Sequence, residues 1–162
     1  MKKLFYNSYI TPILDYGCII WKHGKSSDIN RISKIQKRIA RVILSKPLRS
    51  NSNDNFRALN WLSFRKRSYY FTAIMVFKTI NGLVPSYMDN LIKISNNQHY
   101  GLRSNSTDIA HVSIPKTNYL KKTFSYSGMA IWNSLPLHIR NISSINAFKR
   151  NLREYLLHHD QF

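Results

Sequence analysis

The chain has 162 residues and a mass of 19.1 kDa, enough for one ordinary hydrophobic core or for one core with an appended lobe. A hydrophobic fraction of 43% with 13% aromatic residues excludes a disordered basic tail. The 25 Lys and Arg residues against 7 Asp and Glu residues give a formal net charge of +18. Such a charge favours a polyanionic partner, nucleic acid first and an anionic membrane second.

The single cysteine, Cys18, excludes an internal disulfide and favours an intracellular protein. Polar residues such as Asn7 and Thr11 interrupt any signal-peptide core, and no window approaches the roughly 18 apolar residues that a membrane span needs. We therefore expect an intracellular protein that is soluble or peripheral. Its expected location is nuclear or nucleocytoplasmic, and no membrane partner is expected.

The first predicted element covers residues 4–21, where large apolar side chains recur at helical spacing. They are Leu4, Phe5, Tyr9, Ile13, Tyr16, Ile20 and Trp21. Pro12 lacks an amide hydrogen and clashes with the preceding turn. The stretch is therefore either one kinked helix or a short helix followed by a second that begins near Pro12.

Residues 27–44 predict an amphipathic helix capped by Ser27 or Asp28. Its apolar face consists of Ile29, Ile32, Ile35, Ile39, Val42 and Ile43. Its basic face consists of Arg31, Lys34, Lys37, Arg38 and Arg41. No acidic residue follows Asp28 in this segment, so the cations lack partners on their own helix. We expect the apolar face to join a core and the basic face to meet nucleic acid.

A polar loop leads to one short helical turn at 54–59, capped by Asn53 or Asp54, and then to a helix over 64–80 that Ser63 caps. The second helix is too apolar for a solvated face, so we expect it in the centre of the core. Its first turn carries Arg65, Lys66 and Arg67, which oppose the helix dipole. An anion docked there would satisfy both the cations and the free amides.

Gly82 is expected in the left-handed conformation that ends this helix, and a short helix should begin at Pro85. Residues 93–123 predict a long, mostly irregular stretch with at most a short edge strand near 111–115. A helix follows over 124–134. The next turn should place Leu135, Leu137 and Ile139 against the core, before a last helix that Ser143 or Ser144 caps.

The chain lacks the usual constellations of an enzyme. Its acidic residues are scattered singly, it has no glycine-rich phosphate loop, and adjacent His158 and His159 would diverge on a helix. We expect neither catalysis nor a metal or other cofactor in this chain. Cys18, Trp61 and Trp132 are interpreted as core residues, as is Trp21, although stacking of the tryptophans on bases stays an alternative.

The candidate nucleic-acid contacts are Lys and Arg residues that recur with almost no acidic counterweight. They are Arg31, Lys34, Lys37, Arg38, Arg41, Arg65, Lys66, Arg67, Arg103, Lys121 and Lys122. The alternatives are a plain solvated face and a protein-interaction or scaffold module whose basic helix docks on an acidic partner.

Several segments resemble the region after the catalytic palm in non-LTR retrotransposon reverse transcriptases of the LINE and Jockey type. The N-terminal ones are L-F-Y-N-S-Y-I-T-P-I-L-D-Y-G-C-I-I-W, I-S-K-I-Q-K-R-I-A-R-V-I-L and K-T-I-N-G-L-V-P-S-Y-M. The later ones are Y-G-L-R-S, F-S-Y-S-G-M-A-I-W-N-S-L-P-L-H-I-R-N and S-I-N-A-F-K-R-N-L-R-E-Y-L-L. Together they cover nearly the whole chain in the family's order.

This resemblance implies a helical thumb that grips the template–primer duplex, followed by a C-terminal region. Lys34, Lys37, Arg38 and Arg41 would then contact the duplex, on a framework formed by residues 16–21. The palm with its paired aspartates and magnesium, and the endonuclease, are expected only in a longer parent polymerase, whose palm domain would be a partner.

We therefore predict a mainly α fold in three parts. A thumb-like helical bundle should span residues 1–92 and an irregular stretch residues 93–123. A C-terminal helical unit should span residues 124–162 and pack on the bundle. The expected partners are RNA, DNA or an RNA–DNA hybrid duplex.

Overall fold

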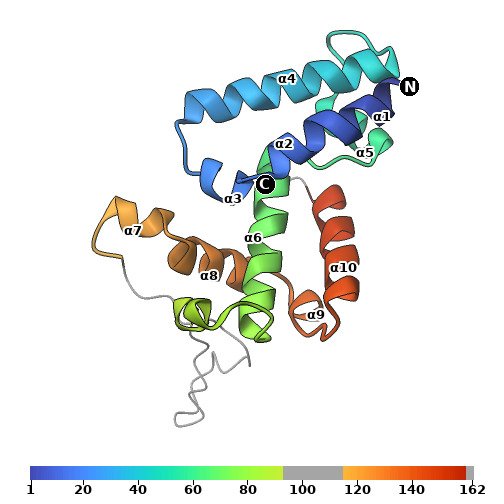
Figure 1. Cartoon of the computed structure of the whole chain (residues 1–162). Coiled ribbons are helices and arrows are strands. Elements are labelled where there is room, and N and C mark those ends of the chain that lie inside the picture. Colours follow the sequence, from blue (N-terminus) through green and yellow to red (C-terminus); the bar gives the residue numbers. More distant parts are fainter. Residues whose placement is uncertain (93–114, 160–162) are drawn as a thin grey trace. The chain divides into compact units, whose positions relative to one another are not determined.

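The computed structural model describes residues 1–92 and 115–159, and its fold is mainly α, as predicted (Figure 1). No strand occurs within these two ranges. The expected edge strand lies almost entirely outside the described residues. The chain divides into two compact units, one formed by Met1–Phe71 with Arg153–Phe162 and the other by Thr72–Leu152. Two helices, α6 (Phe64–Ile80) and α10 (Ile145–His158), contribute residues to both units.

The first unit begins with a nearly continuous helical stretch. It comprises α1 (Lys2–Phe5), a π-helical turn η1 (Tyr6–Ile10) and α2 (Thr11–Asp15), and is followed by α3 (Cys18–Trp21). In the π turn the Thr11 amide donates to the Tyr6 carbonyl five residues earlier. This widened turn directly precedes Pro12, which cannot donate to the carbonyl four residues before it. The helix therefore continues through Pro12.

The helical stretch breaks later, at the two residues that directly follow α2. Tyr16 is extended, and Gly17 has a φ of +72°, a conformation that residues with a Cβ rarely adopt. The burial pattern also differs from the predicted apolar series, whose seven members are all exposed. Tyr6 and Cys18 are buried instead, and Ile10 and Leu14 are partly buried against the core.

Beside this stretch runs α4 (Ser26–Leu44), which a loop joins to α5 (Ser52–Leu59) (Figure 1). The predicted α4 bounds differ by one residue, but the predicted cap was wrong, since Lys25 occupies the N-cap position without a side-chain hydrogen bond. The α5 cap is Asn51, whose side chain accepts from the Asn53 amide, instead of Asn53 or Asp54. In both cases the helix starts earlier than predicted.

Two groups of buried side chains form the core of the first unit. One centres on Tyr6, whose ring stacks on Trp61 with centroids 3.8 Å apart, together with Ala40, Phe56 and Leu59. The other consists of Cys18, Ile29 and Phe64. Partly buried residues of α2 and α4 pack against both groups. Helix α4 is therefore held along most of its length on one side.

The second unit contains the C-terminal half of α6 and the elements that follow it. They are the 3₁₀ helix η2 (Ser86–Leu91), α7 (Asn118–Lys122), α8 (Phe124–Ser134), α9 (Leu137–Arg140) and most of α10. Its core stacks Phe77 on Phe148 at 4.4 Å, with Trp132 5.9 Å from Phe148. A Cβ added to Gly128 would lie 2.9 Å from a Val76 methyl, so α8 approaches α6 closely at that glycine.

Several predictions for this unit are confirmed. Gly82 ends α6 with a φ of +64°, and the Leu83 amide donates to the Lys78 carbonyl at 2.8 Å, which together form a helix-terminating turn. The bounds of α6 and α8 and the burial of Leu135 and Ile139 are also as predicted. One prediction was wrong, since Leu137 is exposed. Most of the stretch expected to be irregular lies outside the described residues, and its described end contains α7, which Thr117 caps.

Candidate nucleic-acid interface

Helix α4 places its cations away from the core of the first unit. Successive residues are about 100° apart around a helix, so Lys34 and Arg38 both lie nearly opposite the buried Gln36. Arg31 and Lys37 are also exposed, whereas Arg41 is half-buried. In the part of the chain that the structure describes, no carboxylate pairs with the four exposed cations. These four cations thus form a continuous exposed basic surface. We call it the α4 ridge, and it consists of Arg31, Lys34, Lys37 and Arg38.

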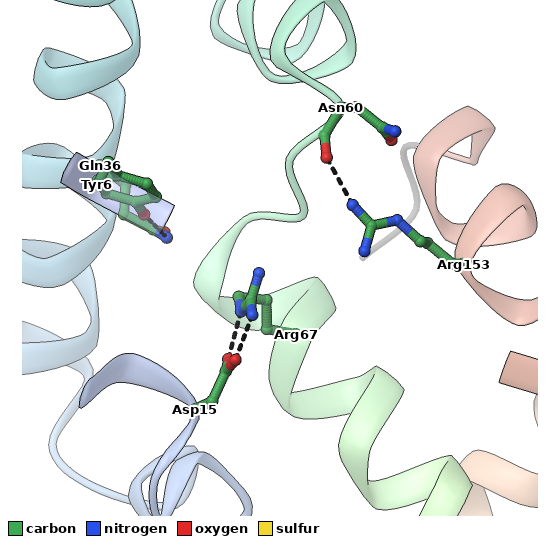
Figure 2. Close-up of polar contacts among 6 residues, drawn as sticks. All are labelled: Tyr6, Asp15, Gln36, Asn60, Arg67 and Arg153. Atoms are coloured by element: carbon green, nitrogen blue, oxygen red, sulfur yellow. Dashed lines mark hydrogen bonds and ion pairs between the residues drawn. The ribbon is translucent and has the colours of Figure 1, made fainter. Parts of the chain in front are cut away.

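A buried polar residue sets the orientation of this ridge. Gln36 is only 2% exposed, and its side-chain amide donates to the Tyr6 oxygen at 2.9 Å (Figure 2). Its carbonyl oxygen accepts from the Phe64 amide at 2.8 Å. Burial raises the pKa of the Tyr6 hydroxyl, which the Gln36 hydrogen bond partly opposes. Because Gln36 is bonded on both sides, α4 cannot rotate about its axis without losing buried hydrogen bonds.

Sequence reasoning missed Gln36 because it stood among cations. Its spacing was a usable signal, since it lies four residues after Ile32 and four before Ala40, on the side that the structure buries. Two members of the predicted apolar face were misplaced. Ile35 and Val42 are 59% and 54% exposed, because the buried side of α4 centres on Gln36 and both residues lie about 100° or more from it.

Arg41, which follows the ridge on α4, forms a hydrogen bond with the loop after this helix. Its guanidinium donates to the Leu48 carbonyl at 2.9 Å. Lys46 and Arg49 in the same loop are exposed cations that were absent from the predicted site. Both follow the C-terminal end of α4 in the chain.

The three cations at the start of α6 have different environments. Arg65 is exposed and donates to the Asn30 side chain at 3.2 Å, which places it next to α4. Lys66 is buried, and Arg67 forms a two-pronged ion pair with Asp15 (Figure 2). The Lys66 amide reaches the Ser63 hydroxyl oxygen at 3.4 Å, in keeping with Ser63 as the cap. Hydrogen bonds within the chain thus already engage the Phe64 and Lys66 amides and the Arg67 charge.

The remaining predicted contacts lie elsewhere. Lys121 and Lys122 are exposed on α7 of the second unit. Arg103 lies outside the described residues. The structure therefore brings together Arg31, Lys34, Lys37, Arg38 and, through Asn30, Arg65.

Burial changes the titration of two groups near α3. It lowers the pKa of Lys22 to about 8 and raises that of the Cys18 thiol to about 11. Cys18 is fully buried, as expected for a core residue. Trp61 and Trp132 are also core residues, whereas Trp21 is 41% exposed, contrary to expectation.

Neither a metal-binding cluster nor a membrane helix occurs in residues 1–92 and 115–159. No group of three His, Cys, Asp or Glu side chains there could hold a metal ion. None of the helices in those ranges combines the length and apolar character needed to cross a bilayer.

Comparison with known proteins returns no matching family model, no similar curated protein and no similar solved structure.

Proposed function

We propose that this chain is a non-catalytic nucleic-acid-binding part of a retrotransposon reverse transcriptase. It holds a template–primer duplex or the element's own RNA through phosphate contacts. The observation that carries this proposal is the α4 ridge, because four exposed cations share one helix side that faces away from the core and no described carboxylate neutralises them. The motif resemblance described above supplies the biological setting.

The geometry of the ridge suits a phosphate backbone. Residues 31–38 rise along the helix by about 10 Å, which spans about three phosphates of one strand. Lysine and arginine contacts to phosphates carry no sequence information by themselves. We therefore expect sequence-independent binding. Its affinity should fall steeply with salt, because the free energy gained by releasing counterions from the nucleic acid shrinks as the salt concentration rises. Arg65, Lys46 and Arg49 would extend the contact, while Arg103, Lys121 and Lys122 remain candidates.

The test is a binding titration over a salt series with duplex DNA, duplex RNA and an RNA–DNA hybrid. The variant Lys34→Ala/Lys37→Ala should weaken binding to all of them and reduce the slope of log affinity against log salt by about 2, since each lost phosphate contact removes about 0.9. The matched control is Lys116→Ala/Arg150→Ala, which removes the same charge from two exposed positions of the second unit.

Two results would overturn the proposal: an affinity that hardly changes with salt, or equal losses in the ridge and control variants. The scaffold alternative predicts weak nucleic-acid affinity together with a saturable complex between α4 and an acidic protein. It therefore gains support only from the first of these results.

The parent enzyme can be tested separately. The reading frame upstream of Met1 should encode a palm with a Tyr-x-Asp-Asp-type carboxylate pair, which would bind the magnesium of the polymerase reaction. Unrelated sequence at that place would remove the reverse-transcriptase setting but would leave nucleic-acid binding by the α4 ridge open to the titration above. Nuclear or nucleocytoplasmic location belongs to the same proposal.

A further inference from the structure

An apolar groove runs between the first helical stretch and α4. Its volume is about 720 Å³. The apolar lining comes from Met1, Phe5 and Ile10 on one side and from Ile39, Val42 and Ile43 of α4 on the other. Phe5 is 57% exposed although it is large and apolar, and Val42 is exposed to a similar extent. Contiguous exposed apolar surface of this kind often marks a binding site for another molecule.

The polar groups in the groove are few and of one sign. Lys2 and Arg38 supply its charges, and no acidic residue lines it. Tyr6 also lines the groove, and its hydroxyl already accepts from Gln36. These features therefore favour a molecule that is apolar where it enters the groove and negatively charged where it meets Lys2 and Arg38.

These features discriminate between classes of occupant. A nucleobase would bury polar edges against aliphatic side chains that cannot hydrogen-bond to them. An extended peptide would leave backbone groups without partners, since the groove is bounded by helices and not by a sheet edge. A helix satisfies its own backbone and can pack an apolar stripe between two helices. A second copy of this strongly basic chain would bring like charges together.

We infer that this groove binds an acidic amphipathic helix of a partner protein. Apolar side chains at three- and four-residue spacing would lie on Phe5, Ile39 and Val42, and flanking carboxylates would pair with Lys2 and Arg38. The inference does not rest on nucleic-acid binding. Of the ridge residues, only Arg38 lines the groove, so Lys34 and Lys37 belong to the proposed nucleic-acid contact alone.

The experiment measures binding of synthetic peptides of about fifteen residues to the full chain by fluorescence anisotropy. The probe is a Leu/Glu helix with leucines at i, i+3, i+4 and i+7. One comparison peptide has the same composition in scrambled order, and the other has Lys in place of Glu. The probe should bind at least about tenfold more tightly than either, because only it combines an apolar stripe with negative charge.

Variants then locate the site. Val42→Glu should weaken probe binding about tenfold or more, by placing a carboxylate in the groove. The matched control is Ile20→Glu, because Ile20 is also an exposed apolar residue of the first unit but does not line the groove. Lys34→Ala/Lys37→Ala should leave probe affinity nearly unchanged while it weakens nucleic-acid binding, so failure of one proposal is distinguishable from failure of the other.

Several outcomes would overturn the inference. Equal binding of the scrambled peptide would show charge attraction alone, and equal effects of Val42→Glu and Ile20→Glu would place the contact elsewhere. Val42-dependent dimerisation in sedimentation would assign the groove to a second copy. Val42-dependent binding to anionic vesicles or to single-stranded RNA, without probe binding, would assign it to lipid or to nucleic acid.

Discussion

The carboxylate of Asp15, at the end of α2, accepts two hydrogen bonds from the guanidinium of Arg67, 52 residues later in the first turn of α6 (Figure 2). Both side chains are mostly shielded from solvent, with 24% of Asp15 and 16% of Arg67 exposed. The pair joins two helices of the first unit and compensates a partly buried cation. It therefore gives Arg67 a structural role that does not require nucleic acid.

Removal of this carboxylate should destabilise the protein. We expect Asp15→Asn to lower the free energy of unfolding by about 2 kcal/mol, because Arg67 would keep its charge in a shielded position without a counter-ion. Urea unfolding followed by far-UV circular dichroism measures the change. Asp54→Asn is the control, since the Asp54–Arg57 pair is 3.7 Å apart and largely exposed, and its loss should cost less than about 0.5 kcal/mol. Equal costs for the two variants would contradict this role of Asp15.

Gln36 should be among the most sensitive positions of α4. Gln36→Met keeps the length of the side chain but leaves the Tyr6 hydroxyl and the Phe64 amide buried without their partner, so a loss of about 2–3 kcal/mol is expected. In that background Tyr6→Phe should cost less than it does in the natural sequence, because it removes an orphaned hydroxyl. A double-mutant cycle measures this coupling. Additive losses would mean that the two side chains act independently.

The lowered pKa of Lys22 predicts a stability difference between the natural chain and a Lys22 variant that depends on pH. Its pKa in the folded chain, about 8, lies below its ordinary value of 10.5, so burial disfavours the charged form. The unfolded chain binds more protons between these values, and the contribution of Lys22 to stability therefore rises as pH increases from about 8 to about 10.5. Below pH 8 the full penalty is present.

Lys22→Met should accordingly be more stable than the natural chain at pH 7, and the difference should shrink as pH rises. The Cys18 thiol has the opposite dependence: burial raises its pKa to about 11, so its contribution to stability falls as pH rises above its ordinary value of 9.0. Because Lys22 also acts on the pKa of Cys18, the comparison of the two proteins is most direct below about pH 9. Urea unfolding at intervals between pH 7 and pH 9.5 measures the difference. A difference that stays constant over this range would contradict burial of the Lys22 ammonium.

Gly128 tests the packing of the second unit. A Cβ at this position would lie 2.9 Å from a Val76 methyl, so Gly128→Ala should cost about 1–2 kcal/mol despite the better helix propensity of alanine. Val76→Ala creates room and should remove most of that additional cost when the two changes are combined. Gly82→Ala is a useful contrast. No atom lies within 4 Å of its added Cβ, so any cost there comes from its positive φ and should not depend on Val76.

Local sequence patterns were sufficient for the helices that end at strong signals. The bounds of α6 and α8 and the Gly82 turn follow from spacing, capping residues and glycine conformation, all of which act over a few positions. The positions of the cations on α4 also follow from its period. The mainly α fold and the basic surface could therefore be predicted without coordinates.

Side-chain partners could not be predicted in this way, because they depend on residues far apart in the chain. Periodicity identifies an apolar stripe but not which part of it meets another helix, so it placed exposed Ile35 and Val42 with the core and overlooked buried Gln36. A charge count likewise cannot show that Arg67 is neutralised by Asp15, which stands 52 positions earlier. Composition and local spacing thus determined the helices and the net charge of this protein. Only the tertiary structure decided which cations are buried or paired within the protein, as Lys66 and Arg67 are, because packing selects their partners.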